Sequence, residues 1–324
     1  MTAAETRSLL DTAIHRAAVI PLPGRTHLEI TGADRAAFLH NFCTNHIKGL
    51  SVGQGCEAFV TNIKGRILGH VLVYADSERL LLETVPGQAT ALLSHLDRYI
   101  ITEDVQLADR STEWTQLFIS GSESEGVLKS TLGIPEFAPG AGVRIVPVGE
   151  GSVRRFSLGA VPGYSIVGPV DWVSSCQEKL VAAGAGIGGP DLFEQLRVEA
   201  GFPIYSIDLS EDNLAQEANR TSRAISFNKG CYLGQEPIAR LDSMGHVNRA
   251  LCQVISNSPA AVPAGADVFA AVDAAEPAGK LTSATVWPLT GQTVGLGLLR
   301  RELAREGWDC WIGNERIPAT VRVK

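Results

Sequence analysis

The stretch "NKGCYLGQEPIARL", residues 228–241, places a thiol beside a cation and ahead of a predicted helix. Cys231 follows Lys229 by two positions, and Pro237 suits the first turn of a helix through "PIARL". A nearby cation and a helix amino terminus both favour the thiolate, which is the nucleophilic and redox-active form of cysteine. The alternative role is that of a small buried hydrophobe, which is common for a single cysteine. The spacing alone leaves both roles open.

A second candidate is a carboxylate at the end of a short predicted helix in "GGPDLFEQLRVEAGFP". Pro190 and Gly201 bracket this helix, and Glu199 falls in its last turn on the same face as Leu192 and Leu196. An anion is disfavoured at a helix carboxy terminus by about 0.3–1 kcal/mol. Glu199 is therefore either a solvated residue at the edge of the core or a carboxylate that faces a pocket. In a pocket it would accept hydrogen bonds from an N–H-rich ring such as a pterin or guanine.

Basic side chains accumulate around the cysteine motif. Residues 220–249 contain five basic and two acidic side chains, so their net charge is +3, whereas the whole chain carries −7. This segment could receive the anionic tail of a ligand, although charged runs are more often simply solvated.

Several other classes of site are excluded by their missing motifs. The six cysteines contain no CxxC pair, the seven histidines no HExxH, and the glycines neither GxGxxG nor GxxxxGK[ST]. No GxSxG sequence marks a nucleophilic serine. We therefore predict no permanently bound metal.

The amino-acid composition limits the classes of protein to which this chain can belong. The 324 residues are 45% hydrophobic and 19% charged, which is typical of a globular chain of about two domains. The acidic balance argues against a general nucleic-acid binder, and no apolar run approaches the ~18 residues that a membrane span needs. The low cysteine content, six in 324 residues, is typical of proteins from a reducing compartment, where disulfide bonds are rare. We expect a cytoplasmic protein that binds neither nucleic acid nor membrane.

The elements that must position these residues are of mixed type. Residues 1–100 alternate strand and helix patterns with hairpins between them, which indicates an α+β unit. Residues 111–190 are less periodic and contribute mainly to a second α+β lobe. Short strand-like runs after residue 247 predict a carboxy-terminal β-module. We therefore divide the chain into residues 1–246, with two lobes that are discontinuous in sequence, and residues 247–324.

"KGCYLGQEPIARL" and the preceding "LRVEAGFPIYSIDLSEDNLAQEA" resemble the signature region of the YgfZ family, which is related to the T-protein (aminomethyltransferase) of the glycine cleavage system. "LEITGADRAAFLHNFCTNHIKGLSVGQGCEAFVTNIKGRILGHVLVY" resembles the first conserved block of that superfamily, and "VGLGLLRRELA" resembles part of its terminal barrel. The resemblance implies a three-lobed ring, with two α+β lobes and a carboxy-terminal β-barrel around a channel that holds tetrahydrofolate. It further implies a role in the assembly or repair of iron–sulfur clusters in client enzymes such as radical-SAM methylthiotransferases.

The resemblance also assigns roles to individual residues. The pterin-contacting glutamate of the T-protein "RLEAG" motif falls on Glu199, and the family's motif cysteine falls on Cys231, with Lys229 beside it. Tyr232, Gln235 and Arg240, from the same motif, are expected to contact the cofactor, tetrahydrofolate or a derivative.

One departure bears on activity. Aminomethyltransferases have an aspartate pair, one of which is the catalytic acid, where this chain has Gly69 and His70. This argues against classical aminomethyl transfer. The leading hypothesis is a tetrahydrofolate-binding accessory protein for iron–sulfur enzymes. The alternatives are a folate-dependent aminomethyltransferase, one-carbon transferase or demethylase in which His70 acts as a base, and a scaffold with a vestigial folate site.

Overall fold

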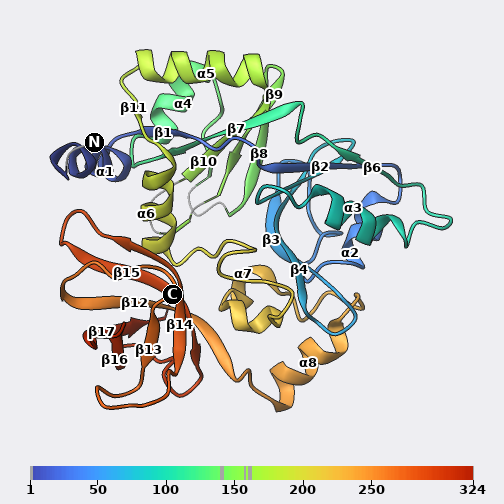
Figure 1. Ribbon diagram of the computed structural model, residues 1–324. Coiled ribbons are helices and arrows are strands. Elements are labelled where there is room, and N and C mark those ends of the chain that lie inside the picture. Colours follow the sequence, from blue (N-terminus) through green and yellow to red (C-terminus); the bar gives the residue numbers. More distant parts are fainter. Residues whose placement is uncertain (1–2, 139–141, 157, 160–162, 324) are drawn as a thin grey trace.

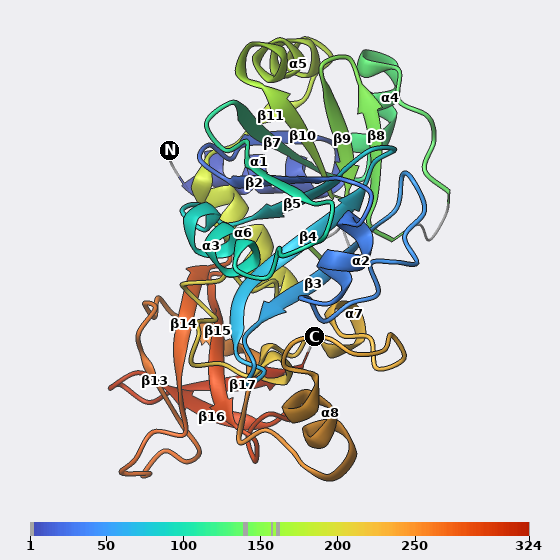
Figure 2. The same ribbon diagram turned by 90° about the vertical axis from the view of Figure 1, so that its right-hand side faces the viewer.

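The computed structural model describes residues 3–138, 142–156, 158–159 and 163–323. Two sheets flanked by helices form one side of the molecule, and a closed barrel lies against them (Figure 1). Figure 2, turned by 90°, shows the barrel below both sheets.

The first sheet combines segments that are distant in the sequence. In spatial order its strands are β11 (Gly186–Ile187), β1 (Ala18–Pro21), β7 (Trp114–Ser120), β10 (Gly163–Pro169), β9 (Gly151–Arg155) and β8 (Arg144–Val148). Only the β1–β11 pairing is parallel. The helices of this unit are α1 (Ala3–His15), α4 (Ser124–Leu132) and α5 (Val170–Ala182). Helix α1 and strand β1 thus come from the start of the chain, whereas the other elements of this unit follow residue 113.

The second sheet is built from one continuous segment. Its strands in spatial order are β3 (Gly55–Thr61), β4 (Ile67–Ala75), β5 (Leu80–Thr84), β2 (Thr26–Thr31) and β6 (Gln106–Asp109), and its helices are α2 (Arg35–His40) and α3 (Ala89–Asp97). Alternate residues of β4 enter two different cores: Val71 and Val73 pack toward α3, whereas Leu72 and Tyr74 pack against the first sheet. Because both of its faces are covered, β4 reads as a nearly continuous apolar run.

The carboxy-terminal unit is a closed barrel of short antiparallel strands. Its strands in spatial order are β12 (Arg249–Pro259), β15 (Gln292–Arg300), β14 (Gly279–Val286), β13 (Asp267–Phe269), β16 (Asp309–Ile312) and β17 (Ile317–Arg322). Closure leaves the barrel without the free strand edges of an open sheet.

A connecting region links the three units. It contains α6 (Pro190–Ala200), the 3-10 helix η1 (Ala215–Ala218), α7 (Thr221–Ala224) and α8 (Gln235–Met244). As predicted, Pro190 is in the first turn of α6, and Gly201 ends that helix with a φ of 73°. This left-handed conformation favours glycine and is the usual way for a helix to stop.

The predicted fold class, two α+β lobes with a carboxy-terminal β-barrel, is confirmed. Within the described residues, no helix has the length and apolar character required to cross a membrane. No three histidine, cysteine or acidic side chains of the described part lie together in an arrangement that could bind a metal ion.

Candidate functional site

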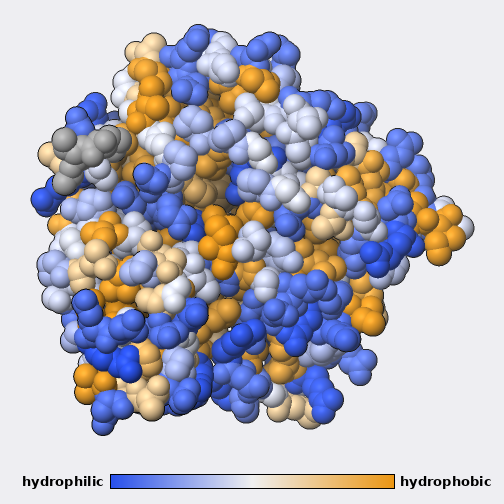
Figure 3. Space-filling view, viewed as in Figure 1, coloured by the Kyte–Doolittle hydropathy of each residue, from blue (hydrophilic) through white to orange (hydrophobic). Residues whose placement is uncertain are grey.

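A cavity of about 650 Å³ opens where the first α+β unit, the connecting region and the barrel meet. Its apolar wall includes Phe118 from β7, Leu196 from α6 and Trp287, which follows β14. Figure 3 shows apolar side chains in a shaded hollow beside α6 on the face drawn in Figure 1. An apolar cavity with a few polar groups is the usual form of a small-molecule site.

Glu199 is one of the polar residues that line this cavity. It lies in the last turn of α6, as the sequence predicted, and its side chain is 31% exposed. Arg322 of β17 places Nη1 3.4 Å from Glu199 Oε1. This partner could not be found from helical spacing, because it lies 123 residues further along the chain.

The barrel also fixes the backbone beneath Glu199. The buried side-chain amide of Gln253, on β12, donates from Nε2 to the carbonyls of Val198 and Glu199, each at 2.8 Å. These bonds add to the 3.1 Å bond that the Val198 carbonyl accepts from the backbone N–H of Gly201, and they supply a partner for the carbonyl of Glu199 in the last helical turn. The carboxylate therefore sits on a rigid support that is shared by α6 and the barrel.

Arg220 is a second charged residue of the cavity wall, and the sequence did not single it out individually. Its Nε and Nη2 donate to the two carboxylate oxygens of Glu57 on β3, at 2.7 and 2.5 Å. His70 on β4 places Nε2 2.8 Å from Glu57 Oε1. Burial alone would raise the pKa of Glu57, but the hydrogen bonds from Arg220 and His70 outweigh it and lower that pKa to about 2. Glu57 is therefore an ionised, buried carboxylate.

The Gly69–His70 pair divides between the two faces of β4. A Cβ at Gly69 would lie 2.9 Å from Leu92 Cδ2 of α3, so this position faces the core of the second sheet. His70 faces the opposite side and packs between the rings of Phe59 and Phe202, with centroid separations of 5.0 and 5.3 Å. Of the two positions, only His70 faces the side on which Glu57 and Arg220 lie.

Cys231 is exposed, which contradicts its alternative role as a buried hydrophobe. It precedes Gln235, the first residue of α8, by four positions. Gly230 and Gly234 have φ values of 87° and 84°, and a Cβ at Gly234 would lie 2.4 Å from the carbonyl oxygen of Asn62. These two glycines allow the tight turn that exposes the thiol.

Lys229 does not direct its charge at Cys231. Its buried ammonium donates to the carbonyls of His40 and Cys43 and lies 4.6 Å from the centre of the Tyr232 ring. Burial lowers the pKa of Lys229. The interpretation that Lys229 stabilises a Cys231 thiolate therefore fails on geometry, because the two carbonyls and the ring occupy its cation.

The other motif residues do not line the Glu199 cavity, as far as the described residues define its walls. Tyr232 is buried in a cluster with Phe59 and Ile67, Gln235 starts α8, and Arg240 is exposed on that helix. The structure thus separates the sequence candidates into Glu199 at the cavity and a motif region at α8.

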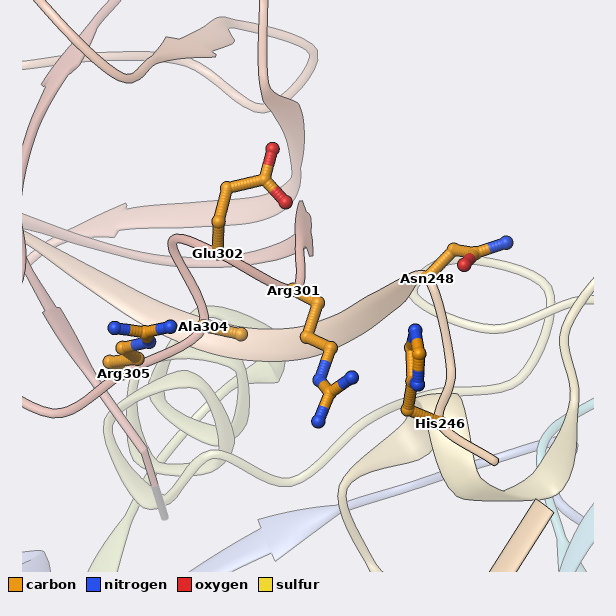
Figure 4. A pocket seen from close by; sticks show the side chains of 6 residues that line it. All are labelled: His246, Asn248, Arg301, Glu302, Ala304 and Arg305. Atoms are coloured by element: carbon orange, nitrogen blue, oxygen red, sulfur yellow. The ribbon is translucent and has the colours of Figure 1, made fainter. Parts of the chain in front are cut away.

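A second cavity of about 610 Å³ lies beside the barrel and is lined almost entirely by polar side chains (Figure 4). Arg301 points toward the space between Arg305 and His246, whereas Glu302 points away from it. All four side chains are exposed. This cavity lacks the apolar walls that would enclose a ring system, so the Glu199 cavity is the stronger candidate for a small-molecule site.

Comparisons with known proteins agree with this architecture. The chain is 29% identical to the tRNA-modifying protein YgfZ of Yersinia enterocolitica over 242 residues, covering 74% of this chain and 71% of that protein. It is 25% identical to the aminomethyltransferase of Rubrobacter xylanophilus over 313 residues, covering 94% of this chain and 82% of the relative.

The fold is also that of a solved structure. The glycine cleavage system aminomethyltransferase T from Bartonella henselae superposes with a TM-score of 0.85 at 18% identity, covering 98% of this chain and 88% of that protein. The predicted resemblance to YgfZ and the T-protein is confirmed. The model of the GCVT N-terminal domain family matches residues 11–229, about two thirds of the sequence. The chain therefore belongs to the GCVT N-terminal domain family.

Proposed function

We propose that this protein binds a reduced folate and acts as an accessory protein in the assembly or repair of iron–sulfur clusters. The observation that carries the proposal is the carboxylate of Glu199 in an apolar cavity between the first α+β unit, the connecting region and the barrel. A carboxylate accepts hydrogen bonds from adjacent N–H groups, which a pterin presents on one edge.

The residues of the cavity fit such a ligand. Its volume of about 650 Å³ lies within the ordinary range for small-molecule sites, and Phe118 and Trp287 offer aromatic surfaces to a flat ring. Arg223 is exposed and lines the same cavity, where it suits the anionic glutamate of a folate.

The role in cluster maintenance rests on the similarity to YgfZ and on the exposed thiol. A cluster would be cargo that is passed to or from a client enzyme, and Cys231 is accessible for a transient contact or a redox exchange. The YgfZ relative is described as tRNA-modifying. Because this chain carries a net charge of −7, we infer an indirect effect on tRNA through client radical-SAM methylthiotransferases rather than direct binding.

Titration calorimetry with tetrahydrofolate tests the binding site. The wild type should bind, and Glu199→Gln should weaken binding about 10-fold or more, because the neutral amide replaces a charged acceptor. Glu302→Gln at the polar cavity of Figure 4 is the matched control and should bind as the wild type does. Wild-type protein that does not bind tetrahydrofolate would overturn the proposal.

Complementation tests the thiol. In cells that lack the endogenous protein, Cys231→Ser should fail to restore the activity of a radical-SAM methylthiotransferase while it retains tetrahydrofolate binding. Ser243→Ala, an exposed change on α8, is the control and should restore that activity fully. Full rescue by Cys231→Ser would remove the thiol from the proposal.

A one-carbon transferase is the second candidate, and the position of His70 is the observation that favours it. A carboxylate at Nε2 leaves the other ring nitrogen, Nδ1, available as a base in the neutral tautomer. A transfer assay with methylene-tetrahydrofolate as product would support this candidate if turnover occurred and was lost in His70→Ala. No turnover by the wild type would exclude it.

A further inference from the structure

The guanidinium of Arg220 has one nitrogen that the protein does not use. Nε and Nη2 both donate to Glu57, whereas Nη1 has no partner among the described residues. Nη1 is not fully buried, so it reaches accessible space. Arg220 lines the Glu199 cavity and also a pocket of about 10 Å³ beside the barrel, and of these two spaces only the cavity can hold a ligand.

Contacts on several sides hold this side chain in place. The guanidinium lies 5.1 Å from the centre of the Phe202 ring, and the bidentate contact with Glu57 is itself supported by His70. The geometry of a bidentate arginine–carboxylate pair fixes the plane of the guanidinium.

The backbone that carries Arg220 is fastened to the second sheet as well. The hydroxyl of Thr44 donates to the carbonyl of Ala224 at 2.6 Å. The side-chain amide of Asn45 donates to the carbonyls of Glu57 and Arg223, each at 2.8 Å. The donor that faces the cavity is therefore preorganised, so little ordering is needed when a ligand binds.

Arg220 and Arg223 occupy different depths although both line the cavity. Arg220 is only 6% exposed, whereas Arg223 and its neighbour Ser222 are exposed. A deep, fixed donor suits a specific polar atom of an enclosed ring. An exposed, mobile cation suits a flexible anionic tail at the mouth of the cavity.

We propose that Arg220 is a specificity-determining residue that binds a hydrogen-bond acceptor on the ring system, beside the N–H donors that bind Glu199. The proposal rests on the proposed folate-binding function and refines it. The ligand class is a 4-oxo pteridine, whose 2-amino group and N3–H are donors and whose adjacent O4 is an acceptor. Glu57 and His70 are positioning residues for Arg220, and Arg223 meets the glutamate of the tail.

The test compares two ligands that differ at O4 and, because a ring without O4 carries no proton on N3, also at the N3–H donor. Tetrahydropteroate and its 4-deoxy counterpart, which has hydrogen in place of O4, both lack the glutamate tail. A hydrogen bond from a charged donor corresponds to about a 10-fold difference in affinity or more. The wild type should therefore bind the 4-oxo compound at least 10-fold more tightly in titration calorimetry.

The variants are chosen so that the cavity wall still folds. Arg220→Met combined with Glu57→Gln removes the buried ion pair as a unit and leaves no uncompensated charge. In this double variant the affinity ratio of the two ligands should fall about 10-fold below that of the wild type, and the ratio that remains reflects the loss of N3–H opposite Glu199, which both proteins share. Glu57→Gln alone retains Arg220 but releases its guanidinium, and the ratio should fall to an intermediate value.

Arg223→Ala is the matched control. It should leave the 4-oxo to 4-deoxy ratio unchanged and should instead reduce the affinity advantage of tetrahydrofolate over tetrahydropteroate. A wild-type ratio near 1, or a ratio that stays at the wild-type value in both the Arg220 and the Glu57 variants, would overturn the role of Arg220 while folate binding stands. No binding of tetrahydrofolate or tetrahydropteroate by the wild type would instead overturn the folate proposal itself.

Discussion

At the scale of single residues, the six cysteines differ in their access to water. Cys231 is exposed, whereas Cys43, Cys252 and Cys310 are buried. Burial raises the pKa of Cys43 to about 11, and those of Cys252 and Cys310 to about 12, so these thiols are protonated at neutral pH.

Cys231 should therefore react first with an alkylating reagent such as iodoacetamide at pH 7. Peptide mass spectrometry of the native protein should find it labelled at least 10-fold faster than any buried cysteine. Unfolding in urea should remove the difference, because all six thiols then reach solvent. Equal rates in the native protein would contradict the exposure of Cys231.

Glu57 predicts a specific pH dependence of stability. Its pKa is lowered from 4.5 to about 2 in the folded protein, so its contribution is complete above about pH 4.5 and is lost as the pH falls toward 2. The shift corresponds to about 3 kcal/mol. Urea unfolding from pH 6 to pH 3 should show this loss in the wild type, and Glu57→Gln should have a flatter dependence. An identical pH slope in both proteins would contradict the buried pairing.

At the scale of elements, α6 is the part that joins the cavity to the barrel. Arg197 on α6 is fully buried, donates to Asp208 Oδ2 at 2.8 Å and reaches Ser283 Oγ of β14 at 2.7 Å. Asp208 also accepts from Ser283 at 2.6 Å. This charged cluster lies beneath the helix whose last turn carries Glu199.

Arg197→Met should destabilise the protein by about 3–5 kcal/mol, because it leaves Asp208 as an uncompensated buried charge. The double change Arg197→Met and Asp208→Asn should restore part of that loss. Arg301→Met removes an exposed arginine and should change the free energy of unfolding by less than about 0.5 kcal/mol. The urea midpoints of the wild type and the three variants provide the measurement, and an Arg197→Met midpoint equal to that of Arg301→Met would refute the role of the cluster.

The sequence predicts elements better than it predicts the contacts between them. Pro190 and Gly201 mark the ends of α6 because helix start and stop signals are local. The pairs Glu57–Arg220 and Glu199–Arg322 are separated by 163 and 123 residues, so no spacing within an element could reveal them. For the same reason the position of Lys229 next to Cys231 in the sequence was misleading, because its side chain turns to the end of α2.

At the scale of the whole molecule, the cavity takes its walls from α1 and β7 of the first α+β unit, from α6 and α7 of the connecting region, and from the loop after β14 of the barrel. A ligand that contacts all of them stabilises their association and not one unit alone. Ligand at 100 times its dissociation constant adds about 2.7 kcal/mol to the stability of the bound state.

Tetrahydrofolate should therefore slow amide hydrogen exchange in the first α+β unit, the connecting region and the barrel together. Protection is expected in β7, in α6 and in β14, whereas the exposed surface of α8 should exchange as before. Glu199→Gln at the same ligand concentration should show little protection. Protection confined to a single unit would place the ligand elsewhere.

The pairing of Glu199 with Arg322 also has a consequence for synthesis on the ribosome. At ~5–20 residues per second, the 123 residues between them take about 6–25 s to translate. At the start of that interval a nascent chain has produced α6 but lacks Gln253 of its support and Trp287 of the cavity wall, and it lacks the arginine that pairs with the carboxylate until the end of the interval. Ligand capture therefore cannot guide the early stages of folding, and it marks chains in which the barrel has already closed.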